Sequence, residues 1–184
     1  MTSSDRIPLI SQRADVPQDS RDHYDAIVDS RGGVRGPFRV LLHSPEVAGR
    51  IGYLGAYIRF EGELPDATRE TAILTTARAW DCAFEWAAHA PIAEEAGVDA
   101  DVIELIAEEA DLPALGEPER TIVGYARELI ETNRVADDTY ETAVEQLGMT
   151  GTVELTATTG YYSMIACVLN AFEVVPDPGT PSFE

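Results

Sequence analysis

Helical periodicity between proline and glycine breaks is the feature that most restricts the fold of this chain. The 184 residues include 14 Gly and 11 Pro, which divide the sequence into segments. Within most segments, apolar side chains recur at the three- and four-residue spacing of an amphipathic helix. No segment shows the strict apolar–polar alternation of a half-buried strand. The pattern therefore predicts an all-α protein.

Proline, glycine and capping residues predict where these helices begin and end. Ser44 before Pro45 is a favourable N-cap followed by proline in the first turn, and Asp81 is expected to cap the helix that starts at Cys82. Pro91 falls inside that helix, so we expect a kink or a loosened turn just after His89. The expected helices cover 20–30, 44–58, 65–80, 82–96, 99–109, 117–132, 137–147 and 150–174. We expect an N-terminal arm over 1–19, a single helical domain over 20–174 and a proline-containing tail over 175–184.

The charge of the chain excludes several classes of function. The sequence has 13 basic and 33 acidic residues, a formal charge of −20, and its basic residues are all Arg. Without Lys there is no Schiff-base chemistry and no phosphate-binding loop lysine. A surface this acidic repels nucleic acid and anionic lipid, so neither is an expected partner. The excess of carboxylates predicts a high-salt setting, where screening reduces their mutual repulsion.

The sequence also predicts a cytoplasmic protein that does not enter a membrane. No apolar run approaches the ~18–20 residues that a membrane-spanning helix needs. The N-terminal sequence lacks the basic start and apolar stretch of a secretory signal. Cys82 and Cys167 have no metal-binding spacing, so we expect two thiols in a reducing compartment.

One short motif has the composition of a small catalytic site. Glu70, Cys82, Glu85 and His89 are spaced as E-x11-C-x2-E-x3-H. Four residues separate Glu85 from His89, which places a carboxylate and an imidazole on one helix face, one turn apart. Glu70 lies on the preceding segment and is positioned to fold back toward them. Such a set suits acid/base chemistry, and its spacing matches no familiar metal-ligand pattern, so no metal is expected.

Each member of the motif also has an ordinary structural explanation. A single His on a helix is more often a packing residue, and Glu70 in a first helical turn is favoured by the helix dipole. Small buried thiols such as Cys82 are common in protein cores. Glu85 alone has the character of a solvated charge. It is the combination that favours a functional site.

The segment LPDATRETAILTTARAWDCAFEWAAHAPIAEEAGV, residues 64–98, resembles the carboxymuconolactone decarboxylase family, which includes the AhpD-like alkylhydroperoxidases. Residues 36–65 and 153–174 resemble the helices before and after the family's motif. The peroxidase branch has a second Cys where this chain has Glu85. The decarboxylase-like branch has a Glu-Trp-x-x-His segment, and residues 85–89 resemble it. The resemblance implies an AhpD-like all-helical fold, a protein without a cofactor, and a homo-trimer or homo-hexamer.

This resemblance implies a carbon–carbon lyase acting on a small carboxylated or lactone molecule. In that chemistry, loss of CO2 leaves charge on a conjugated lactone, which a neighbouring acid must protonate. His89 is the expected proton donor and Glu70 its orienting partner. Glu85 either shuttles a proton or presses on the substrate carboxylate by like-charge repulsion. An anionic substrate needs a cation, for which Arg59 and Arg78 are the nearest candidates in sequence. Two alternatives stay open: a thiol peroxidase acting through Cys82, and a non-catalytic oligomeric protein.

Overall fold

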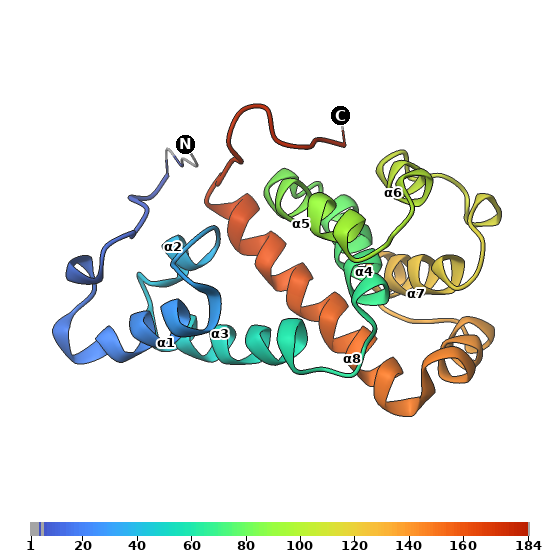
Figure 1. Ribbon diagram of the computed structural model, residues 1–184, viewed down its shortest axis with the longest axis horizontal. Coiled ribbons are helices and arrows are strands. Elements are labelled where there is room, and N and C mark those ends of the chain that lie inside the picture. Colours follow the sequence, from blue (N-terminus) through green and yellow to red (C-terminus); the bar gives the residue numbers. More distant parts are fainter. Residues whose placement is uncertain (1–3, 5, 184) are drawn as a thin grey trace. The chain divides into compact units, whose positions relative to one another are not determined.

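A computed structural model describes residues 4 and 6–183, and helices are their only extended regular elements (Figure 1). The predicted all-α class is confirmed. Among the described residues, no helix is both long enough and apolar enough to cross a membrane. Eight α-helices and three short 3₁₀ turns follow one another as η1 Arg13–Asp15, η2 Gln18–Ser20, α1 Arg21–Arg31, α2 Phe38–Leu41, α3 Pro45–Phe60, α4 Asp66–Ala79, α5 Ala83–Glu95, α6 Ala100–Ala107, η3 Leu112–Ala114, α7 Glu119–Thr132 and α8 Asp137–Ala171.

The turn between α4 and α5 differs from the sequence prediction. Cys82 occupies the N-cap position of α5 and Asp81 does not, so the predicted Asp81 cap is wrong. Asp81 instead has a left-handed backbone with φ of 46°. Its carboxylate accepts a hydrogen bond from Arg78 Nη1 at 2.5 Å, which ties it to the last turn of α4. The side chain therefore closes the preceding helix and does not cap the next one.

Helix α8 contains a break that the glycine pattern predicts. Gly148 has φ of 70° and ψ of 175°, which is not helical, and it separates two helical stretches that follow each other directly. Only glycine adopts a positive φ at little steric cost, which explains its position at the break. The second stretch ends at Ala171, three residues before the predicted end at Val174.

The chain forms two compact units. Unit 1 comprises the described residues of Met1–Gly62 together with Cys167–Pro178. In this unit α3 packs against α1 and α2, and Gly52 permits close approach because a Cβ there would lie 3.3 Å from Ile27. Unit 2 comprises Glu63–Ala166 and the described residues of Gly179–Glu184. The predicted division into an arm, one domain and a tail stays a prediction.

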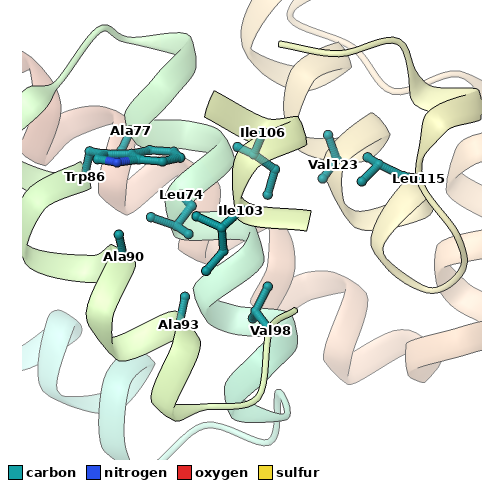
Figure 2. Close-up of a cluster of buried hydrophobic side chains, with 10 residues drawn as sticks. All are labelled: Leu74, Ala77, Trp86, Ala90, Ala93, Val98, Ile103, Ile106, Leu115 and Val123. Atoms are coloured by element: carbon teal, nitrogen blue, oxygen red, sulfur yellow. The ribbon is translucent and has the colours of Figure 1, made fainter. Parts of the chain in front are cut away.

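Helix α4 is the centre of unit 2. It packs against α5, α6 and α7. Figure 2 shows Leu74 and Ala77 of α4 in one cluster with Trp86 of α5 and with Ile103 and Ile106 of α6. A second buried cluster includes Ala72, Ile122, Tyr125 and Leu155. Glu154 of α8 accepts hydrogen bonds from the backbone N–H groups of Glu63 and Leu64, at 2.7 and 3.0 Å, and so holds the segment that leads into α4.

Burial on every side makes α4 unusual for a helix that contains polar residues. Ten consecutive residues, from Thr68 to Ala77, are buried. Its buried threonines satisfy their hydroxyl groups locally, since Thr71, Thr75 and Thr76 each donate to the carbonyl four residues earlier at 2.8 Å. A buried charged residue has no such local solution and needs a charged partner. The two charged residues in this stretch are Arg69 and Glu70, and Glu70 pairs with His89 of α5.

Candidate active site

Helices α4 and α5 bring three residues of the sequence motif together. The short turn after Ala79 makes the two helices pack against each other. Glu70 projects from the second turn of α4, while Glu85 and His89 lie one turn apart on α5. All three side chains are buried, with exposed fractions of 1%, 5% and 4% respectively.

The two nitrogens of the His89 ring have different environments. Nδ1 lies 2.6 Å from Glu70 Oε2, which is the distance of a strong charge-assisted hydrogen bond. Nε2 lies 3.4 Å from Glu85 Oε2, close enough for an ion pair but longer than a typical hydrogen bond. The short contact fixes the orientation of the ring. The long contact leaves Nε2 as the nitrogen that is less tightly engaged.

The two carboxylates favour the charged form of His89. Burial by itself lowers the pKa of the imidazole, because it removes water from the cation. Hydrogen bonding and charge from Glu70 and Glu85 act in the opposite direction and raise the pKa of His89 to about 9. At neutral pH the site is therefore an imidazolium between two carboxylate groups, able to give up a proton when a base is formed beside it.

Two further residues contact this group, and neither was predicted from the sequence. Arg69 is buried, and its Nε lies 3.6 Å from Glu70 Oε1. The Tyr162 ring meets the His89 ring edge-on, with ring centroids 5.1 Å apart. The sequence feature that could have identified Arg69 is its position next to Glu70 in an otherwise Ala- and Thr-rich helix. The feature that could have identified Tyr162 is its place in the Tyr- and Thr-rich segment 150–174.

The two cysteines have opposite exposure. Cys82 is fully buried at the N-cap of α5, where its backbone N–H donates to Ala77 at 2.8 Å. Cys167 is exposed and belongs to unit 1. Neither of these residues forms a disulfide. A role for Cys82 in catalysis stays a prediction.

The two arginines selected from the sequence lie in different surroundings. Arg59 is in the last turn of α3, in unit 1, with its guanidinium over the Phe60 ring at 5.1 Å. Arg78, in the last turn of α4, donates to the Ala107 carbonyl, to Asp81 and to Glu109 at 2.8, 2.5 and 2.8 Å. These contacts tie α4 to the end of α6. Substrate binding by either arginine stays a prediction.

Within residues 4 and 6–183, no group of three or more His, Cys, Asp and Glu side chains has a geometry that would hold a metal ion.

Comparison with solved structures identifies the fold. The AhpD core protein of Ralstonia eutropha JMP134, a peroxidase-related protein, has 20% identity and a TM-score of 0.73 over 94% of this chain and 92% of its own. A peroxidase-related protein from Silicibacter sp. TM1040 has 14% identity and a TM-score of 0.73 over 98% of this chain and 97% of its own. A Cys→Ala variant of the debrominase Bmp8 in complex with 2,3,4-tribromopyrrole has 14% identity and a TM-score of 0.73 over 96% of this chain and 95% of its own. The chain thus has the AhpD-like fold.

The central stretch of the sequence matches a family profile. The family profile described as carboxymuconolactone decarboxylase family matches residues 45–128, the stretch that contains Glu70, Cys82, Glu85 and His89. The match covers fewer than half of the 184 residues, so it shows a similarity of this central stretch to the family. No curated protein sequence matches it significantly.

Proposed function

We propose that this protein is a cofactor-free, acid/base enzyme of the decarboxylase-like branch that acts on a small carboxylated or lactone molecule. The observation that carries the proposal is the buried Glu70–His89–Glu85 arrangement, with a short contact at Nδ1 and a long one at Nε2. In this proposal Glu70 orients the imidazole. Proton transfer takes place at His89 Nε2, and Glu85 is the second proton-carrying group.

The chemistry can be written with its protons and electrons balanced. The bond between the substrate carbon and its carboxylate breaks, CO2 leaves, and the electron pair stays on the conjugated lactone as an enolate. His89 Nε2 delivers its proton to the substrate carbon, and the neutral imidazole recovers a proton from solvent through Glu85. The raised pKa of His89 keeps the ring protonated until the enolate forms. A cytoplasmic, high-salt setting forms part of the proposal.

The position of Glu85 supports this reading over thiol chemistry. The peroxidase-type motif has a second Cys where Glu85 stands, so the C-x-x-C pair is absent from this motif. Cys82, the thiol that is left there, has no exposed surface. Peroxide reduction by one thiol also requires a second thiol to resolve the oxidised product.

The test is turnover of carboxylated lactones, beginning with carboxymuconolactone, measured as CO2 release by wild type and four variants. We expect His89→Gln and Glu85→Gln to lower kcat by 10²–10⁴-fold, the range of general acid–base catalysis. Cys82→Ser is expected to keep activity, and His43→Gln, at an exposed His, is the matched control.

Other outcomes would redirect the assignment. Peroxide consumption that disappears in Cys82→Ser but survives in Glu85→Gln would replace the decarboxylase proposal with the thiol peroxidase. Absence of both activities across a panel of lactone acids and peroxides would favour a non-catalytic oligomeric protein.

A further inference from the structure

Arg69 is a buried cation whose position the fold alone does not explain. The residue is 8% exposed, and its Nη2 donates to Asp66 Oδ1 at 2.8 Å. Asp66 is largely solvent-exposed, so this pair anchors only the outer end of the guanidinium. The inner nitrogen, Nε, is buried and has no hydrogen-bond partner among the described residues. Its charged neighbour there is Glu70, with Oε1 at 3.6 Å.

The two oxygens of Glu70 face two different cations. Oε2 accepts the hydrogen bond from His89 Nδ1 at 2.6 Å, while Oε1 faces Arg69. A carboxylate held at both oxygens cannot rotate without separating one pair of opposite charges. The imidazole attached to Oε2 is held with it, which directs Nε2 toward Glu85.

A charge count leads to the same residue. Glu70 and Glu85 supply two buried negative charges, and protonated His89 supplies one positive charge. Arg69 supplies a second buried positive charge, which lies between Glu70 and the exposed Asp66. Without Arg69 the buried Glu70 would lose one of its two neighbouring cations, which is costly in free energy.

We propose that Arg69 is a positioning residue of this centre: it holds Glu70 as an oriented carboxylate and thereby sets the orientation and protonation of His89. Its catalytic consequence rests on the function proposed above, whereas its electrostatic consequence does not. The competing explanation is structural, namely that Arg69 only stabilises the start of α4 through its i,i+3 pair with Asp66.

Three variants separate these explanations. Arg69→Met removes the charge but keeps an apolar stem, Arg69→Lys keeps the charge, and Asp66→Asn breaks only the outer ion pair. The first readout is an NMR titration of the His89 imidazole nitrogens, which is tractable because the chain has 3 His. Loss of a neighbouring cation favours the protonated ring, so Arg69→Met should raise the His89 midpoint by roughly one pH unit. Arg69→Lys and Asp66→Asn should leave it near the wild-type value.

A wild-type measurement keeps the proposal testable if Arg69→Met does not fold. The Arg69 Nε–H resonance should show a step at the same pH as the His89 midpoint, because both groups contact Glu70. A flat Arg69 resonance through that pH would overturn the proposal. So would an unchanged midpoint in folded Arg69→Met, or an Asp66→Asn shift as large as that of Arg69→Met.

The second readout is turnover. Arg69→Met should lower kcat by about tenfold or more with little change in KM, and Arg69→Lys should restore most of it, because misplacing a reacting group acts on the chemical step. Equal kcat in wild type and Arg69→Met, with activity present, would overturn the catalytic part. If no substrate is found, the proposed function fails, while the two NMR measurements still decide the role of Arg69.

Discussion

The buried imidazolium predicts a specific dependence of stability on pH. The pKa of His89 rises from 6.5 to about 9 on folding, so the folded protein holds this proton more tightly than the unfolded chain. The resulting stabilisation is fully present below pH 6.5 and is lost as pH rises through about 9. A difference of about 2.5 pKa units corresponds to about 3 kcal/mol of unfolding free energy, with a slope of up to ~1.4 kcal/mol per pH unit.

The matched perturbation is Glu70→Gln. An amide accepts a hydrogen bond but has no charge, so the pKa of His89 should fall by roughly 1–3 units. The change in unfolding free energy between pH 6.5 and 9 should then shrink by about 1.4 kcal/mol for each unit that the His89 pKa falls, although the variant is less stable overall. The assay is urea unfolding at fixed KCl and fixed protein concentration, followed by circular dichroism. Parallel profiles for wild type and Glu70→Gln would refute the reasoning, because all other titrating groups are common to both proteins.

Four further predictions concern regions outside the acid/base centre. Hydrogen bonding from Thr121 lowers the pKa of Glu117 to about 2, against the opposing effect of burial and with further support from neighbouring donors. The stabilisation that the ionised Glu117 provides is present above pH 4.5 and is lost as pH falls through 2. Glu117→Gln should therefore flatten the acid side of a plot of unfolding free energy against pH. Phe183 lies edge-on to Trp86, with centroids 5.6 Å apart, and beneath the Arg78 guanidinium at 4.9 Å. Phe183→Ala should therefore destabilise the protein by roughly 1–2 kcal/mol in urea unfolding, and an unchanged midpoint would show that the tail contributes nothing. Thermal melts in a KCl series should show a rising melting temperature, since screening relieves repulsion within a chain of charge −20, and a fall would argue against a high-salt origin. Light scattering in high salt should give a mass of a trimer or hexamer, in line with the exposed aromatic side chains of α3, and a value near 20.0 kDa would contradict this.

Features governed by local chemistry could be predicted from the sequence. Pro45 and Gly148 have the backbone roles that their types predict, at the start of α3 and at the break in α8. Proline and glycine restrict or extend φ regardless of what packs around them, so their effects are readable without a structure. The predicted cap at Asp81 was wrong because this side chain pairs with Arg78, three residues earlier in the last turn of α4, and Cys82 takes the N-cap position.

The composition of the candidate site was only partly accessible from the sequence. The four-residue spacing of Glu85 and His89 follows from helix geometry alone. The contact between Glu70 and His89 depends on how α4 packs against α5, which no local pattern specifies. Arg69 was missed because periodicity assigns charged residues to a solvated face, and α4 has none. Tyr162 reaches His89 from a helix more than seventy residues later in the chain.

The different exposure of the two thiols allows the opening of α5 to be measured by chemical labelling. Cys167 is exposed, whereas Cys82 is sealed at the start of α5. A maleimide reagent in excess should therefore label the chain in two phases, one immediate and one limited by the rate at which the first turn of α5 opens. The slow phase reports, without any engineered probe, how often solvent reaches the helix that bears Glu85 and His89, and hence how a closed centre admits a reactant.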